Sequence, residues 1–177
     1  GMDFRSKGQF DEADHKGREL NRALLVASEN GRHPILCDTS PCTLQMQEHL
    51  DACLTRHEPV AFAHDHLLPR LALTPVDERI AVHVTCSSTH MGLADKFVAL
   101  ARACAREVVV PADITCCGFA GDKGFTTPEL NASALAGLAD QVKGCSAGYS
   151  NSRTCEIGLS RQGGISYRSI LSLLDRA

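Results

Sequence analysis

Cysteine is the residue type through which this chain can do chemistry. The sequence of 177 residues contains nine cysteines, including the adjacent pair Cys116 and Cys117. Thiolates bind soft metal ions and iron–sulfur clusters, and they also act as nucleophiles and redox groups. The amino-terminal stretch has no apolar segment of the kind that directs secretion, so metal or redox chemistry is expected rather than a disulfide framework. We therefore expect a cytoplasmic protein, which partners could hold at the inner membrane.

Four cysteines stand where a bound group could be held: Cys86, Cys116, Cys117 and Cys155. Each follows a predicted strand in a chain of alternating strands and helices. The carboxyl ends of parallel strands lie at one edge of a sheet, and helix amino termini at that edge favour thiolates, so these four should converge. Four thiolates are the usual ligands of a [4Fe–4S] cluster, and sulfur ligands also favour zinc.

The elements that must position these cysteines are short β-rich runs and amphipathic helical stretches in alternation. The predicted strands are 33–38, 79–85, 107–110 and 144–149, and the helical stretches are 11–30, 92–106, 128–142 and 166–174. This alternation predicts an α/β fold with mainly parallel strands and helices on both faces.

The two halves of the chain share an order of features. A Lys-Gly turn, a helix, a short strand and a Ser/Thr-rich turn lead to Cys42 in the first half and to Cys155 in the second. Self-similarity of this kind indicates an internal repeat. We therefore predict two related lobes, a truncated first repeat over residues 1–76 and a complete second repeat over residues 77–177.

The cysteine pattern resembles that of a known family. Cys86, then Cys116-Cys117-Gly118, then Cys155 is similar to the cysteine-rich CCG domain of heterodisulfide reductases and of glycolate oxidase iron–sulfur subunits. The similarity is greatest to the C-terminal region of bacterial FAD-linked D-lactate dehydrogenases. Here 29 residues separate Cys86 from Cys116, and 33 separate Gly118 from Ser152. Ser152 stands where the family has the first cysteine of its closing Cys-x-x-Cys.

The resemblance implies a function in electron transfer. Family members use five cysteines to hold a non-cubane [4Fe–4S] cluster, and the serine leaves four for a cubane cluster, a labile cluster or a zinc ion. The resemblance implies an iron–sulfur module of a D-lactate or glycolate dehydrogenase-like oxidoreductase, with the metal held by Cys86, Cys116, Cys117 and Cys155. Ser152 would lie beside the cluster as a weak ligand or hydrogen-bond donor, and Gly118 would let the backbone approach it.

The implied partners are a flavoprotein dehydrogenase, either as a module of a parent chain or as a separate chain, and a downstream electron acceptor. FAD is expected only on that parent or partner module, because the chain has no room for a flavin domain and no Cys-x-x-Cys-x-x-Cys run. The chain would not be a complete enzyme alone. The alternative is a metal-free or zinc-stabilised interaction domain that docks onto a flavoprotein dehydrogenase.

Other cysteines and histidines have simpler interpretations. Cys53 and Cys104 lie on apolar helix stripes and are predicted to be small core residues, and Cys145 to be a buried strand residue. His83 could join Cys86, Cys116 and Cys155 in a zinc site, although strand alternation would point it away from Cys86. His90 could contact a cluster sulfide or a partner. A cysteine hydrolase built on Cys86 and a histidine lacks an identifiable orienting group.

Composition excludes several classes of protein. The 18 basic and 21 acidic side chains give a net charge of −3, so a nucleic-acid partner is not expected. No apolar stretch reaches the length of a membrane-spanning helix. The glycine-rich segment 118–124 matches neither the dinucleotide nor the P-loop pattern, so we expect no nucleotide site.

Overall fold

The computed structural model describes residues 2–177, with side chains for all of them except residues 2, 3 and 48. The chain forms two compact units, a first that ends at Pro59 and a second over Val60–Ala177. The boundary between the units lies at 59/60, before the predicted repeat boundary at 76/77. Val60 and Ala63 belong to the second unit because they are buried in its core. That the two units are related repeats stays a prediction.

The first unit combines helices with a pair of very short strands. Its elements are α1 (Met2–Ser6), α2 (Phe10–Ala27), β1 (Ile35–Leu36), α3 (Ser40–His49) and β2 (Arg56–His57). β1 and β2 pair in parallel, with Ile35 opposite Arg56. Helix α2 stops short of the predicted end at residue 30 because Glu29, Asn30 and Gly31 all have positive φ angles, which end a right-handed helix.

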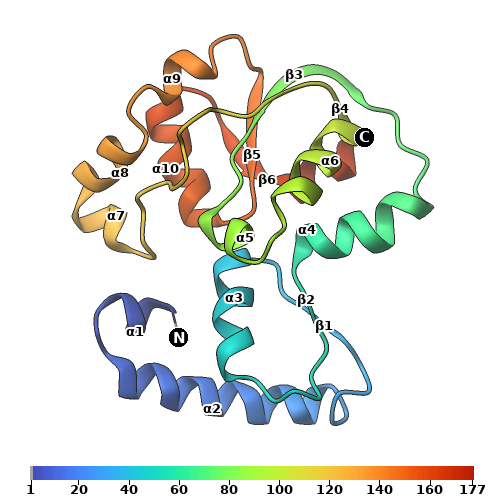
Figure 1. The fold of residues 1–177 in the computed structure, drawn as a ribbon, viewed down its shortest axis with the longest axis vertical. Helices are drawn as coiled ribbons and strands as arrows, with labels where there is room; N and C mark the ends of the chain where they lie inside the picture. Colours follow the sequence, from blue (N-terminus) through green and yellow to red (C-terminus); the bar gives the residue numbers. More distant parts are fainter. Residues whose placement is uncertain (1) are drawn as a thin grey trace. The chain divides into compact units, whose positions relative to one another are not determined.

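The second unit is built on a four-stranded parallel sheet of order β4-β3-β5-β6 (Figure 1). Its elements are α4 (Pro59–Phe62), the π-helix η1 (Ala63–Leu67), the 3₁₀ helix η2 (Leu68–Arg70), β3 (Val76–Val82), α5 (Cys86–His90), α6 (Ala94–Cys104), β4 (Ala105–Val109), α7 (Lys123–Thr126), α8 (Pro128–Ala134), α9 (Leu138–Gln141), β5 (Ala147–Ser150), α10 (Arg153–Gly163), β6 (Tyr167–Ser169) and α11 (Ile170–Arg176). The predicted α/β fold with parallel strands flanked by helices is confirmed.

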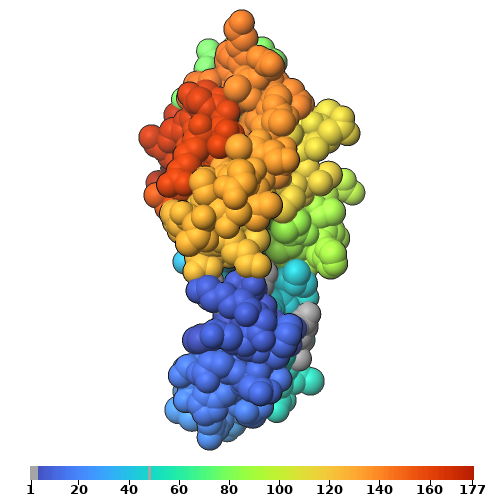
Figure 2. Space-filling view, turned by 90° about the vertical axis from the view of Figure 1, so that its left-hand side faces the viewer, coloured from blue at the N-terminus to red at the C-terminus, as the bar shows by residue number. Residues whose placement is uncertain are grey.

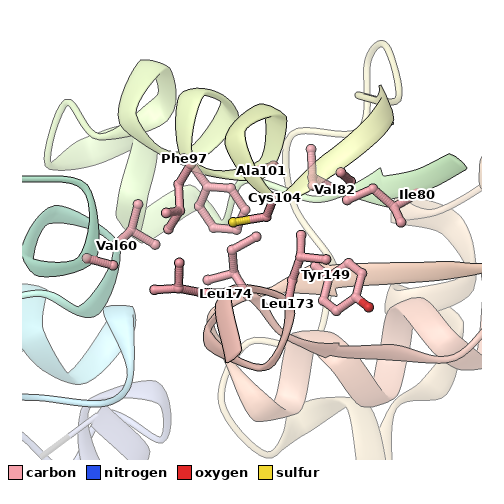
Figure 3. Close-up of a cluster of buried hydrophobic side chains, with 13 residues drawn as sticks. Val60, Ile80, Val82, Phe97, Ala101, Cys104, Tyr149, Leu173 and Leu174 are labelled. Carbon is pink, nitrogen blue, oxygen red and sulfur yellow. The ribbon is translucent and has the colours of Figure 1, made fainter. Parts of the chain in front are cut away.

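Alternate side chains of the central strand β3 enter two different apolar cores. Ile80 and Val82 pack against α6 and α11 in the first core, which Figure 3 shows with the Cys104 side chain among apolar neighbours. Ala81 points into the second core, which it shares with Leu138 and with residues of α10. The sheet thus has a helical layer on each face, and its buried strands are apolar on both sides, as expected for a parallel sheet.

Two predicted helices are divided in the structure. The stretch 128–142 forms α8, which ends at Ala134 with Leu135 as its C-cap, and α9, whose N-cap Gly137 has a φ of 81°. Figure 2 shows this orange segment spread over one face of the second unit. The stretch 166–174 forms β6 before α11, because residues 167–169 pair with β5 in the sheet.

Among the helices of residues 2–177, none is both long and apolar enough to cross a membrane.

Candidate metal centre

The candidate site lies at the carboxyl ends of the neighbouring strands β3 and β5, where the connections leave toward opposite faces of the sheet. The chain leaves β3 for α6, which packs in the first core, and leaves β5 for α10, which packs in the second core on the opposite face. Connections that leave two neighbouring strands toward opposite faces create a crevice at the carboxyl ends of those strands. This crevice is the usual ligand site of open α/β sheets. The candidate cysteines follow β3, β4 and β5, so the topology brings them to this one edge.

The four sulfur atoms form one connected group. Cys117 Sγ lies 2.7 Å from Cys155 Sγ. Cys116 is hydrogen-bonded to Cys117 on one side and to Cys86 on the other. Cys117 and Cys155 are buried, whereas Cys86 and Cys116 are exposed. The sequence-predicted set is therefore brought together, with a buried end and an end open to the surface.

The pKa values of the four thiols depend on one another. Hydrogen bonds from Cys117 and then Cys86 hold the pKa of Cys116 far below its usual value, and a hydrogen bond from Cys117 lowers the pKa of Cys155. The same contacts, together with burial, raise the pKa of Cys86 and of Cys117. Cys117 has a single proton and lies between Cys116 and Cys155, so it can donate to only one of these two sulfur atoms at a time. Lowering the pKa of a thiol favours the thiolate form that binds metals.

The backbone after the cysteine pair is tightly constrained. Gly118 donates its N–H to Cys116 Sγ at 3.4 Å and has a φ of 66°. A Cβ at this position would lie 2.5 Å from the carbonyl oxygen of Leu130 in α8, so only glycine fits. Gly118 therefore supports the Cys116 thiolate from the backbone side while its Cα packs against α8.

A buried polar network, which sequence reasoning missed, fixes the ends of β3 and β5 beside the cysteines. Thr85 Oγ1 donates to Asn151 Oδ1 at 2.9 Å, and Asn151 Nδ2 donates to Ser88 Oγ at 2.8 Å. Thr85 also caps α5 by accepting from the Ser88 N–H. All three residues are buried. The network connects the segment that carries Cys86 to Asn151, the residue before Ser152. In the sequence, the signal for this network was the Ser/Thr/Asn-rich turn after each of the two strands.

A second buried amide holds the cysteine pair. Asn131 on α8 donates from Nδ2 to the carbonyl oxygen of Cys117 at 2.6 Å, and its Oδ1 accepts from Gln162 at 3.3 Å. Ser152 is also buried, just before α10, and its hydrogen bond to Cys155 contributes to the lowered pKa of that thiol. That Ser152 lies beside a cluster, as a weak ligand or hydrogen-bond donor, stays a prediction.

A cavity of about 400 Å³ opens beside the exposed end of the sulfur group. Its lining includes Cys86, Cys116, His83 and His90, together with apolar side chains such as Ile114. His83 is buried, and burial lowers its pKa to about 4, with the nearby Cys116 charge acting in the opposite direction. His83 and Cys86 line the same cavity. β3 ends at Val82 and Cys86 lies in α5, so strand alternation does not relate the directions of these two side chains.

The donor set fits a sulfur-ligated group by its chemistry, although the sulfur atoms are now in mutual contact. Among the residues with described side chains, no three His, Cys, Asp or Glu are arranged so that they could hold a metal ion. Thiolates around a tetrahedral zinc lie about 3.8 Å apart, given Zn–S bonds of about 2.3 Å. The Cys117–Cys155 contact is shorter than that. Binding would therefore have to separate Cys117 from Cys155, which are buried, whereas the cavity lies beside the exposed Cys86 and Cys116.

The remaining cysteines are not part of this sulfur group. Cys104 is buried in the first core, as predicted. Cys145 is buried in the second core, as predicted, but it precedes β5 at the amino end of the sheet and is not a strand residue. Cys53 was wrongly predicted to be a core residue. It is exposed because the chain turns at 51–54 and α3 does not extend to it. Cys37 and Cys42 belong to the first unit, and Cys42 is exposed.

No family model matches the chain, and no curated protein or solved structure matches it. The resemblance to the CCG domain rests on the cysteine pattern alone.

Proposed function

We propose that the second unit is a CCG-type module that holds an iron–sulfur cluster through Cys86, Cys116, Cys117 and Cys155 and transfers electrons for a D-lactate or glycolate dehydrogenase-like enzyme. One observation carries the proposal. Four cysteines from three separate loops form a single connected sulfur group at the crevice of an open parallel sheet. Four thiolates are the ligand complement of a [4Fe–4S] cluster.

The chain's own residues supply the ligands and their electrostatic support. Hydrogen bonding from Cys117 lowers the pKa of Cys116 and the pKa of Cys155. The Gly118 N–H donates to Cys116 Sγ, and hydrogen bonds to ligand sulfur raise the reduction potential of a cluster. Ser152 lies beside Cys155, where its hydroxyl can donate to the same thiolate or serve as a weak oxygen ligand.

The bound group would supply one-electron transfer, which none of the amino-acid side chains at the site provides. The hydroxy acid would be oxidised by FAD on a parent or partner flavoprotein module. The exposed Cys86 and Cys116 mark the end of the site that faces solvent, so an electron donor or acceptor would approach there. We place the cofactor on the second unit only.

Anaerobic reconstitution tests this proposal directly. We expect about four irons and four acid-labile sulfides per chain, with a brown colour, as for one [4Fe–4S] cluster. The double variant Cys116→Ser/Cys117→Ser should lose this uptake. Its matched control is Cys42→Ser/Cys53→Ser, which removes two exposed thiols of the first unit and should load like the wild type.

Other results of the reconstitution would favour the alternative function or overturn the proposal. One zinc without sulfide would favour the interaction domain that docks onto a flavoprotein dehydrogenase. Full iron content in the Cys116→Ser/Cys117→Ser variant would overturn the ligand assignment. A protein that binds neither iron nor zinc after anaerobic reconstitution would overturn the proposed function.

A further inference from the structure

His83 is a buried group beside the sulfur atoms whose hydrogen bonding is incomplete. Its backbone is fixed on both sides, since its N–H donates to the Tyr149 carbonyl at 2.9 Å and its carbonyl accepts from Ser150 Oγ at 3.1 Å. The residue is 2% exposed. The backbone of His83 is therefore held by β5, and its side chain is shielded from bulk water.

The Nε2 atom of this ring has no hydrogen-bond partner among the residues with described side chains. A buried polar atom left unpaired is costly, and in a native protein it calls for an explanation such as an ion or ligand that binds there. The ring nitrogen of His83 is thus available to a group bound next to it.

The location of the ring indicates which group that would be. His83 lines the same cavity as Cys86 and Cys116, and it lies close enough to Cys116 for their charges to interact. Imidazole nitrogen and thiolate sulfur are both common ligands of iron and zinc, and histidine replaces cysteine at some iron–sulfur centres.

We propose that His83 is a fifth protein contact of the metal group that the four cysteines hold, with its Nε2 atom bound to that group on the side of Cys116. This inference rests on the proposed function and adds a nitrogen contact to an otherwise sulfur-based site. His83 comes from the end of β3 and Cys86 from the start of α5, so one strand and the helix after it would supply both contacts.

The test uses the reconstituted and reduced chain of 177 residues, in which only histidine carries ¹⁵N. Pulsed electron paramagnetic resonance should detect a ¹⁵N hyperfine coupling to the paramagnetic group in the wild type. The coupling should be lost in His83→Gln, which keeps a polar side chain of similar length. It should be retained in His90→Gln, the matched control, because His90 lines the same cavity but is exposed.

The outcomes separate this inference from the proposed function. A protein that takes up the cluster without any histidine coupling overturns the inference and leaves the proposed function standing. Coupling that persists in His83→Gln, or that is lost in His90→Gln, also overturns it. Absence of any metal uptake by the wild type overturns both. If His83→Gln fails to fold, a wild-type coupling that is retained in His90→Gln supports the inference, and a wild type without any coupling overturns it.

Discussion

Replacing Asn151 with alanine tests whether the buried amide network holds the candidate site together. Asn151 is 3% exposed and follows β5 directly. The substitution removes the hydrogen bonds of its side chain to Thr85 and Ser88 at 2.9 and 2.8 Å. It leaves the backbone of β5 and the cysteines themselves unchanged.

The expected cost follows from these two contacts. A buried hydrogen bond contributes about 1 kcal/mol net, and a polar group left unpaired costs up to about 3 kcal/mol. Thr85 and Ser88 lie 3.0 Å apart through their hydroxyls and can still pair with each other, so little of the second cost should apply. We expect the free energy of unfolding of the second unit to fall by about 2 kcal/mol.

Tyrosine fluorescence during urea unfolding provides a selective assay. The sequence has two tyrosines and no tryptophan. Tyr149 and Tyr167 both lie buried in the second unit, so the signal reports that unit alone. Phenylarsine oxide, which bridges neighbouring thiols, adds a second readout, because looser ends of β3 and β5 should weaken its capture by the cysteine group.

The control is Ser146→Ala at the opposite end of the same strand. Ser146 is exposed and also makes two side-chain hydrogen bonds, to Glu78 and to the Arg79 carbonyl. An exposed site of this kind should change stability by no more than about 0.5 kcal/mol. If Asn151→Ala costs no more than Ser146→Ala and captures the arsenical equally well, the network does not position the site.

Three further changes have defined outcomes. Burial lowers the pKa of His83 from 6.5 to about 4, so between these pH values the unfolded chain binds a proton that the folded chain does not bind. The free energy of unfolding of the metal-free protein should therefore fall by roughly 3 kcal/mol as the pH falls from about 6.5 to about 4. Urea unfolding at several pH values should show a weaker pH dependence in His83→Gln, and an equal pH dependence would contradict the burial argument. Cys104→Ala should cost about 1 kcal/mol in unfolding experiments, since a fully buried sulfur is removed from the first core, yet leave iron uptake unchanged. Gly118→Ala should lower the free energy of unfolding by at least about 2 kcal/mol, because the new Cβ adds overlap with α8 to the strain of a positive φ. Gly92 has a similar φ but open space around it, so Gly92→Ala should cost only about 1 kcal/mol. Equal costs would show that the overlap at Gly118 is relieved.

The convergence of the cysteines was predictable because it depends on topology. Once strands and helices alternate, Cys86, Cys117 and Cys155 follow strands that must lie parallel, and the carboxyl ends of such strands share one edge. Only the alternation of apolar runs is needed for this argument, and the boundaries can be wrong by several residues. The fold class and the grouping of the sulfur atoms therefore followed from the same pattern.

Features that depend on a particular neighbour were not predictable. Asn151 finds Thr85 only after β3 and β5 pair, and a sequence does not give the register of two strands far apart in the chain. His83 shares a cavity with Cys86, and strand alternation could not relate the two residues because β3 ends at Val82, sooner than its apolar run. Cys53 was exposed because α3 stopped at His49, where the apolar periodicity alone gave no end.

The arrangement of the cores implies that metal binding would follow folding. The first core contains none of the four candidate ligands, and the second includes Cys117 and Cys155 among larger apolar side chains such as Phe119, Leu138 and Leu159. Small zinc-dependent domains differ in this respect, since their folding free energy comes from the metal itself. Here the sheet and its two helical layers bury their side chains without a metal. The sulfur atoms are brought together by strand ends and buried amides, so loss of the metal group should leave the second unit folded.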